Sequence, residues 1–173
     1  MLNGVSGCIV LRPLPDSSTR QIMDMAHTPS KHAASKNDVS PLMLAVSAYI
    51  AKAASKPLPK AAVEATKHHL LDTLAAIVSG ARLHPGKVTI AWLKTQGGKP
   101  EACVPGSRIV TTASNAAFGS GMLAHADETD DSHAPSCLHP GCGIVPGALA
   151  MAERVGASGT ALLRATALGY DIG

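Results

Sequence analysis

The sequence predicts a mainly α-helical domain built from several packed helices. Three observations support this fold class. Hydrophobic residues make up 46% of the 173-residue chain but aromatic residues only 2%, so the core must consist of small aliphatic side chains that let helices approach closely. Apolar residues recur at helical spacing in most segments after residue 40. Proline and glycine stand where these helical patterns begin and end.

Six helices are expected in the region after residue 40, each with a recognisable start or stop signal. Ser40 and Pro41 open the first one, because a serine hydroxyl can cap a helix and proline fits its first turn. The expected helices cover residues 41 until Pro57, 60–80, 85–96, 113 to about 126, 144–155 and 158 to about 170. Two β-prone runs, 102–104 and 108–110, predict at most a short hairpin around the Pro105-Gly106 turn.

Residues 1–39 differ from the rest of the chain in composition. They show no sustained apolar period and are rich in Ser, His, Lys, Asn and Asp. This composition is typical of a flexible segment that cannot bury enough apolar surface to fold. We therefore expect a flexible leader over 1–39 and a helical domain over 40–173.

Two helices carry residues whose packing can be predicted. In the helix over 60–80, Asp72 lies on or near an apolar stripe that the pattern places on the inner face, formed by Val63, Leu70, Leu71, Leu74, Ile77 and Val78. We expect Asp72 to form hydrogen bonds between helices, since a buried carboxylate needs partners. Gly119 and Gly121 lie inside the helix over 113–126. Glycine weakens a helix interior by about 1 kcal/mol relative to alanine, so this pair indicates tight packing or close approach by a ligand.

Composition excludes several classes of protein. The net charge is only +3, the basic residues are scattered, and aromatic residues that could stack on bases are few, so we expect no nucleic-acid partner. No run approaches the roughly 20 apolar residues of a membrane span, and the first residues lack a signal-peptide pattern. The four cysteines form no CxxC pair, which suits a reducing compartment. We expect a cytoplasmic protein that does not interact with membranes.

The candidate functional stretch is HADETDDSHAPSCLHPGCG, residues 125–143. Four of the twelve acidic residues of the chain fall within five positions here, namely Asp127, Glu128, Asp130 and Asp131. Histidines stand on both sides of them, and small apolar residues flank the whole stretch. The pattern predicts a polar loop held between two buried helices, which is a common way to build a site.

A metal site is the first interpretation of this loop. The EF-hand pattern fails, because Ser132 stands where its glycine is needed and Leu138 where its bidentate glutamate is needed. Zinc held by Cys137, His139 and Cys142 would have an unusual ligand spacing and no fourth ligand. We therefore expect no metal ion and no other cofactor.

Two interpretations without a metal remain open. The carboxylates could cap helix ends while the histidines bond to the backbone, a purely structural role. Alternatively, the loop could perform general acid and base chemistry, because histidine titrates near neutrality and a neighbouring carboxylate orients its ring. Such a group can remove a proton from carbon and protonate a departing hydroxyl.

The stretch AAFGSGMLAHADETDDSHAPSCLHPGCGIVPGALAMAERVGASGTALLRATALGYDIG, residues 116–173, resembles the MmgE/PrpD family, which includes 2-methylcitrate dehydratase and cis-aconitate decarboxylase. The distinctive part is an acidic DD[ST]H run followed by HPG and an alanine-rich helix. HLLDTLAAIVSGA and VPGSRIVTTASNAAF resemble the same family, so the likeness covers roughly residues 40–173. It implies a helical N-terminal domain and a cofactor-independent site for a small di- or tricarboxylate.

The resemblance also implies residue roles. The histidine of HPG, His139, is the candidate for proton transfer, and Ser132 supplies the hydroxyl that follows the paired aspartates. The acid two positions before the pair is Glu128 by direct count, with Asp127 as the competing residue. The expected catalytic residues are His139, Ser132, Glu128 and Asp127, and the expected substrate-binding residues are Asp130, Asp131 and His133.

Family members continue into a second, lid domain that supplies further basic and phenolic groups, and none of these can be placed on this chain. We therefore expect an incomplete site and impaired activity from these 173 residues alone. The expected activity is lyase-type, dehydration or a related proton transfer on a substrate such as 2-methylcitrate, in a homodimer. The alternative is a non-catalytic helical module that serves folding or dimerisation, which an exposed apolar face on the last helices would favour.

Overall fold

The computed structural model describes residues 39–53 and 55–173. The expected leader over 1–39 therefore lies outside the described residues, apart from Val39. Nearly all of the described chain belongs to one compact unit, Leu42–Gly173. Within the described ranges, six helices and one two-stranded hairpin confirm the predicted mainly α-helical class.

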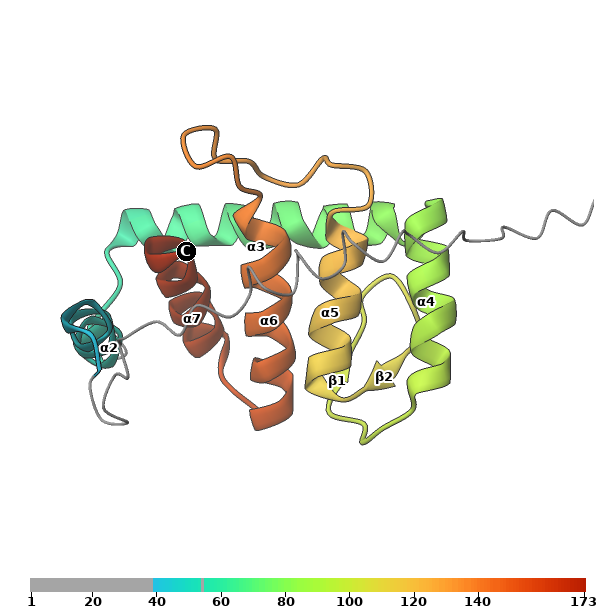
Figure 1. Cartoon of the computed structure of the whole chain (residues 1–173), viewed down its shortest axis with the longest axis horizontal. Coiled ribbons are helices and arrows are strands. Elements are labelled where there is room, and N and C mark those ends of the chain that lie inside the picture. Colours follow the sequence, from blue (N-terminus) through green and yellow to red (C-terminus); the bar gives the residue numbers. More distant parts are fainter. Residues whose placement is uncertain (1–38, 54) are drawn as a thin grey trace, which may run out of the picture. The chain divides into compact units, whose positions relative to one another are not determined.

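The observed elements follow the expected order along the chain (Figure 1). They are α2 (Pro41–Ala53), α3 (Lys60–Gly80), α4 (His84–Gln96), β1 (Ala102–Cys103), β2 (Val110–Thr111), α5 (Ala113–Ala124), α6 (Pro140–Val155) and α7 (Gly159–Ile172). The two strands pair antiparallel, with Ala102 opposite Thr111. Compared with the prediction, α6 begins four residues earlier, because the proline of HPG occupies its first turn.

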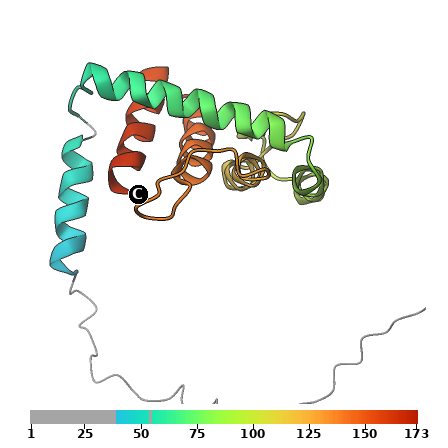
Figure 2. The same ribbon diagram turned by 90° about the horizontal axis from the view of Figure 1, so that it is seen from above.

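The four helices α4, α5, α6 and α7 pack side by side in chain order, and α3 crosses this row (Figures 1 and 2). Contacts join α4 to α5, α5 to α6 and α6 to α7, while α3 contacts α5, α6 and α7. Figure 2 shows α3 lying along the ends of the helices in this row. The segment between α5 and α6 runs along the same edge, beside α3. One helix therefore supports the loop and the three helices nearest to it.

The ends of the helices follow the signals in the sequence. The Thr112 hydroxyl accepts a hydrogen bond from the Asn115 N–H at the start of α5, and the Ser158 hydroxyl accepts one from the Ala161 N–H at the start of α7. Gly156 ends α6 in the left-handed region, with φ of 62°. These side chains and the glycine satisfy backbone groups that a helix end leaves without partners.

The face that α3 buries differs in part from the predicted one, since Ile77 is fully buried as predicted. Leu71 is 69% exposed, Val78 is 46% exposed and Asp72 is also exposed, so the predicted inward positions of these three residues are wrong. The buried positions include Thr66 and Thr73, which lie two turns apart on one face. Because α3 crosses the row of helices, its fully buried positions form a narrow stripe of small and β-branched residues, while Leu70 and Leu74 beside this stripe are half-buried.

Several glycines allow the helices to approach each other closely. A methyl group on Gly80 would lie 1.9 Å from the backbone oxygen of Leu123, so α3 and α5 touch backbone to backbone there. A methyl group on Gly119 would meet the side chain of Leu93, and one on Gly121 would meet the carbonyl oxygen of Cys142. Of the two explanations considered for the glycines in α5, the structure shows tight packing.

The contact at Gly80 predicts a stability difference between two glycine substitutions. Gly80→Ala should lower the free energy of unfolding by about 1–3 kcal/mol, because overpacking against a backbone atom forces the helices apart. Gly147→Ala in α6 should leave it unchanged or raise it by about 0.5–1 kcal/mol, since no atom lies within 4 Å of the added methyl group. Urea unfolding followed by circular dichroism measures both, and equal effects would contradict the backbone contact.

Candidate active site

The loop between α5 and α6 lies beside α3 (Figures 1 and 2). His125 directly follows the last residue of α5, and His139 directly precedes the first residue of α6. The tip of the loop is closed by an antiparallel bridge, in which the His133 N–H donates to the Leu138 carbonyl at 2.8 Å. Both ends of the loop are thus fixed by helices, and its middle is fixed by its own backbone.

Asp130 is the centre of the first cluster in this loop. Its side chain is fully buried, and its Oδ1 atom lies 3.1 Å from His125 Nδ1 and 3.3 Å from His139 Nδ1. The two imidazole rings meet edge to face, with centroids 4.8 Å apart. A buried carboxylate needs donors, and these two ring nitrogens are within its reach. The structure therefore places His139, the expected proton-transfer residue, against an acid.

Asp131 forms a second cluster that points toward other elements. Its Oδ1 accepts a hydrogen bond from the Gly141 N–H at 2.8 Å, and its Oδ2 accepts one from the Tyr170 hydroxyl at 2.7 Å. His69 Nδ1 lies 3.1 Å from the same Oδ2, and the His69 ring stacks on Tyr170 with centroids 4.2 Å apart. A carboxylate at the first turn of α6 also suits the positive end of the helix dipole. Asp131 thus joins the loop to α3, α6 and α7.

Gly141 makes this second cluster possible. A methyl group at this position would lie 2.4 Å from Asp131 Oδ1 and 2.7 Å from the Thr73 hydroxyl oxygen. The glycine of HPG is therefore required for close packing of the α6 start against the acid. The proline before it starts the helix, and the histidine before that carries the proposed chemistry.

The two acids at the start of the loop have separate surroundings. Asp127 accepts hydrogen bonds from the Ser79 hydroxyl at 3.0 Å and from the Thr129 hydroxyl at 2.7 Å. The Thr129 hydrogen bond, with a smaller contribution from Ser79, holds the pKa of Asp127 below its usual value. Glu128 is exposed, with a φ of 56°. Neither acid is among the contacts of the Asp130 cluster described above.

The other expected residues lie on the outer part of the loop. Ser132 and His133 are exposed, and His133 Nδ1 lies 2.7 Å from the Ser136 hydroxyl oxygen. The Cys137 thiol donates to the Ala134 carbonyl at 3.6 Å. These contacts are local to the tip of the loop. Of the expected site residues, the structure therefore brings together the neighbouring Asp130, Asp131 and His139, whereas Ser132 and His133 lie apart from them on the exposed tip.

Cys142 adds a thiol to the first cluster. Burial, followed by the nearby carboxylate of Asp130, raises the pKa of the Cys142 thiol to about 11. The thiol therefore remains protonated at neutral pH. It donates a hydrogen bond to the carbonyl oxygen of His139 at 3.1 Å, which fixes the turn that carries the imidazole.

Sequence reasoning missed two neighbours of the site on other elements, His69 and Tyr170. Neither residue belongs to the acidic loop that the sequence indicates as the functional stretch. The position of His69 four residues before the buried Thr73 places both on the same side of α3, and that spacing was the available signal. Tyr170 is separated from the loop by nearly the whole of α6 and α7, so no local pattern in the sequence relates it to Asp131.

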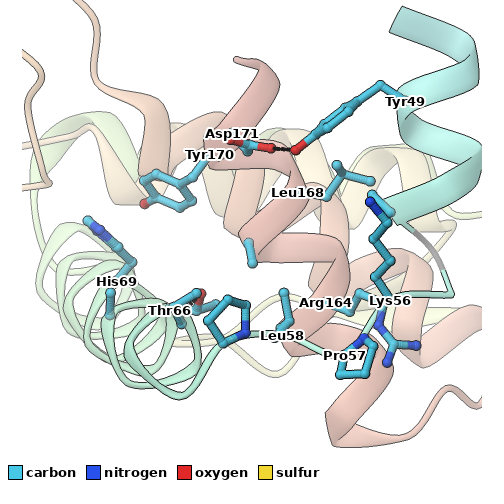
Figure 3. Close-up of a pocket in the computed structure, with 15 residues that line it drawn as sticks. Tyr49, Lys56, Pro57, Leu58, Thr66, His69, Arg164, Leu168, Tyr170 and Asp171 are labelled. Carbon is cyan, nitrogen blue, oxygen red and sulfur yellow. Dashed lines mark hydrogen bonds between the residues drawn. The ribbon is translucent and has the colours of Figure 1, made fainter.

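A cavity in the described part of the chain lies next to the Asp131 cluster. Its volume is about 570 Å³, and it is lined by residues of α2, α3, α7 and the segment before α3 (Figure 3). The polar groups that line it include Lys56, Arg164 and Tyr49, together with His69 and Tyr170. His69 and Tyr170 therefore have one side toward the cavity and contact Asp131 on the other.

The environment of Tyr170 predicts an alkaline titration. Burial, followed by the hydrogen bond to Asp131, raises the pKa of the Tyr170 hydroxyl above its ordinary value. In a Tyr49→Phe variant, Tyr170 is the single tyrosine of the chain. Its tyrosinate absorbance should appear well above pH 10 in the folded protein and near pH 10 in urea, where the pKa is about 10.

The sign of the linked stability follows from the same shift. Because the folded-state pKa is the higher one, protonated Tyr170 contributes stability that is complete below about pH 10 and is lost as the pH rises through the folded-state value. Adding Asp131→Asn to the Tyr49→Phe variant should move the titration part of the way back, since burial remains. If Tyr170 titrated at the same pH in the folded and the unfolded protein, the assigned buried environment would be wrong.

Comparison with known proteins adds one finding to this geometry. The family model described as the MmgE/PrpD N-terminal domain matches residues 45–173, which include α3, α6, α7 and the loop that carries the two clusters. No curated protein and no solved structure matches the chain. No helix in the described ranges is long and apolar enough to cross a membrane. The family match covers most of the sequence, and the chain belongs to the MmgE/PrpD family.

Proposed function

We propose that the loop over residues 125–143 supplies the acid–base part of a cofactor-independent lyase site. The reaction is dehydration, or a related proton transfer, of a small di- or tricarboxylate such as 2-methylcitrate. The observation that carries this proposal is the pair formed by His139 and the buried Asp130, with 3.3 Å between Nδ1 and Oδ1. Family membership supports the reaction class.

The exposure of His139 favours one nitrogen as the reactive one. Its side chain is 32% exposed, yet its Nδ1 is buried beside Asp130. Nε2 is therefore the ring nitrogen left to take a proton from substrate carbon. The Asp130 carboxylate lies 3.3 Å from Nδ1 without a hydrogen bond to it, and its negative charge favours the tautomer that carries the proton on Nδ1 and leaves Nε2 free as a base. In an elimination, Nε2 takes the carbon-bound proton as the C–H electron pair forms the new double bond. The C–O bond then breaks as the hydroxyl receives a proton from the imidazolium and leaves as water.

The start of α6 provides a place for a substrate carboxylate. The first N–H groups of a helix lack partners within it and favour anions. Asp131 uses the Gly141 N–H, while Gly143 is exposed and no atom lies within 4 Å of a methyl group added there. The open surface at Gly143 gives an anion room to approach the first turn of α6, beside the imidazole of His139.

The remaining expected residues keep their proposed roles. Ser132 and Glu128 orient substrate or imidazole, and His133 supports substrate binding. Between the two competing acids, exposure favours Glu128 for the substrate side. Asp127 is already bonded to Ser79 and Thr129, so it is the better candidate for shaping the loop.

Substitution of His139 tests the assignment of proton transfer. The test uses a full-length relative that carries this loop, with the substitution equivalent to His139→Gln. It should lower kcat/KM by about 100-fold or more, since a general acid or base contributes about 10²- to 10⁴-fold to the rate. The amide of glutamine keeps hydrogen bonding but cannot take the proton. The matched control is the equivalent of His84→Gln on α4, an exposed histidine outside the loop, which should stay within about twofold.

Steady-state kinetics on 2-methylcitrate and aconitate provide the measurement, with circular dichroism to show that each variant is folded. Turnover of the His139 variant within about tenfold of the parent would remove this residue from the proposed mechanism. The Asp130 pair would then be structural.

A second candidate function is favoured by an apolar groove on the last two helices. The groove has a volume of about 480 Å³ and is lined almost entirely by aliphatic residues of α6 and α7. Met151 and Val155 in it are 48% and 65% exposed. Exposed apolar surface of this kind marks interaction sites. A helical folding or dimerisation module without catalysis would use it, and the expected homodimer could do so as well.

Light scattering together with an activity assay separates the two functions. The module predicts a stable dimer of the 173-residue chain without turnover, and Met151→Glu should weaken its association by at least about tenfold, because a charge at an apolar contact is costly. Leu71→Glu is the matched control, since Leu71 is 69% exposed on α3 and outside the groove. Turnover by a monomeric chain would exclude the module.

A further inference from the structure

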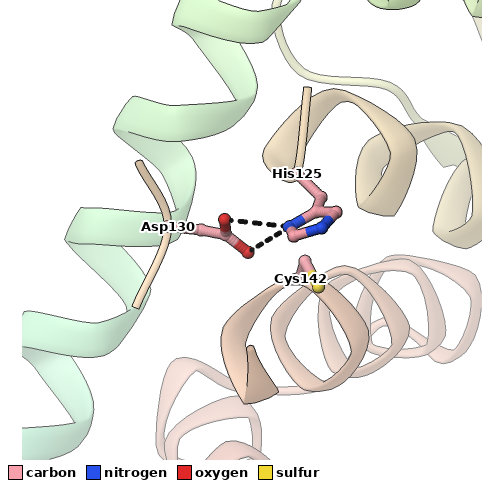
Figure 4. A group of neighbouring side chains, drawn as sticks. All are labelled: His125, Asp130 and Cys142. Atoms are coloured by element: carbon pink, nitrogen blue, oxygen red, sulfur yellow. Dashed lines mark hydrogen bonds and ion pairs between the residues drawn. The ribbon is translucent and has the colours of Figure 1, made fainter. Parts of the chain in front are cut away.

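We propose that His125, Asp130 and Cys142 form a binding site for a divalent ion of the zinc class. His125 follows the last residue of α5, Asp130 lies in the loop, and Cys142 lies in the first turn of α6. Figure 4 shows the three side chains directed toward one another from these separate elements. Each of the three residues offers one atom that can bind a metal ion, and these three atoms all lie within 4.8 Å of one another.

The spacing of the ligand atoms suits a small ion after a modest adjustment. Zinc lies about 2.0–2.3 Å from its nitrogen, oxygen and sulfur ligands, so tetrahedral neighbours are about 3.3–3.7 Å apart. His125 Nδ1 and Asp130 Oδ1 are already 3.1 Å apart. The remaining atoms lie within 4.8 Å, so closure requires movement of about 1 Å, which side-chain rotation can supply.

Burial and access favour a built site over a surface cluster. The Asp130 side chain is fully buried, and Cys142 is half-buried. The His125 side chain is 46% exposed, so an ion can enter from solvent and a water molecule can complete its coordination. Three protein ligands with one open position are the usual composition of a zinc site that exchanges its fourth ligand.

An independent observation comes from His139. Its Nδ1 is buried and makes no hydrogen bond with any described residue, although it lies 3.3 Å from Asp130 Oδ1. A ring nitrogen without a hydrogen bond beside a ligand carboxylate is a natural outer-shell partner, since metal-bound carboxylates are themselves held by donors. Ion binding, by moving Asp130, would allow this nitrogen to form the hydrogen bond that it lacks.

The ligand set selects the class of ion. Sulfur and imidazole ligands suit zinc and its spectroscopic substitute cobalt, whereas magnesium and calcium prefer oxygen ligands. From the sequence we expected no metal ion, and the zinc ligands considered there, Cys137, His139 and Cys142, share only Cys142 with the proposed site. Of these, Cys137 bonds within the loop tip. The proposed ion site does not rest on the lyase proposal, because ion binding can be observed without turnover.

Cobalt titration of the tag-free, reduced 173-residue chain tests the site. The metal ion displaces the proton of the Cys142 thiol when it binds. The resulting thiolate should produce an intense near-ultraviolet sulfur-to-cobalt charge-transfer band, and zinc should displace the cobalt and remove the band. Cys142→Ala should abolish the band and raise the zinc Kd by at least about tenfold, because even loss of an outer-shell partner costs 10–100-fold. His125→Ala should weaken zinc to a similar extent.

The matched control retains Cys142 as the single cysteine. The chain has four cysteines, and a Cys8→Ala, Cys103→Ala, Cys137→Ala triple variant should keep both the band and the zinc affinity within about threefold. The proposal would be overturned if the charge-transfer band disappeared in the triple variant, or if cobalt bound without producing this band. If Cys142→Ala fails to fold by circular dichroism, the triple variant and His125→Ala decide the outcome.

Discussion

The structure of the candidate site depends on two adjacent carboxylates that face in different directions. Asp130 turns into the interior toward His125 and His139, while Asp131 turns toward His69, the start of α6 and Tyr170. Burial of acids is unfavourable unless donors surround them, so each carboxylate holds its donors in place. Every element that contributes a donor is consequently fixed relative to the loop.

This arrangement gives α3 a role beyond the hydrophobic core. Besides its close contact with α5 at Gly80, it places the Ser79 hydroxyl against Asp127 and His69 against Asp131. The same helix therefore contacts the loop at its beginning and at its paired acids. A long helix that crosses a row of others is well suited to this, because its successive turns face successive neighbours.

The sequence was sufficient to predict the helices, most of their ends, the short hairpin and the position of the loop. Capping residues such as Thr112 and Ser158 act through local hydrogen bonds, and a local pattern can reveal them. The inner face of α3 was not predictable in the same way. Its direction is set by the crossing with α5, α6 and α7, so Leu71 remains exposed although it lies in an apolar stripe.

The candidate site was predictable only in part, for the same physical reason. The acids and His139 are close in sequence, and their crowding marked the loop. The partners that orient them are distant: His69 is 62 positions before Asp131 by residue number, and Tyr170 is separated from it by 39 positions. Such contacts follow from how the helices pack, which a single sequence does not reveal. The sequence also did not reveal which aspartate contacts which partner; the structure shows Asp130 beside His139 and Asp131 bonded to Gly141.

The loop between α5 and α6 is held by two separate sets of contacts, and this allows its parts to vary independently within the family. The proposed catalytic imidazole is placed by Asp130 and by the start of α6, whereas the segment between Ser132 and Leu138 is closed by its own backbone bridge. Residues could be gained or lost within that outer segment without displacing the ring. The tip of the loop can therefore change in length and sequence while the buried contact between Asp130 and His139 is kept.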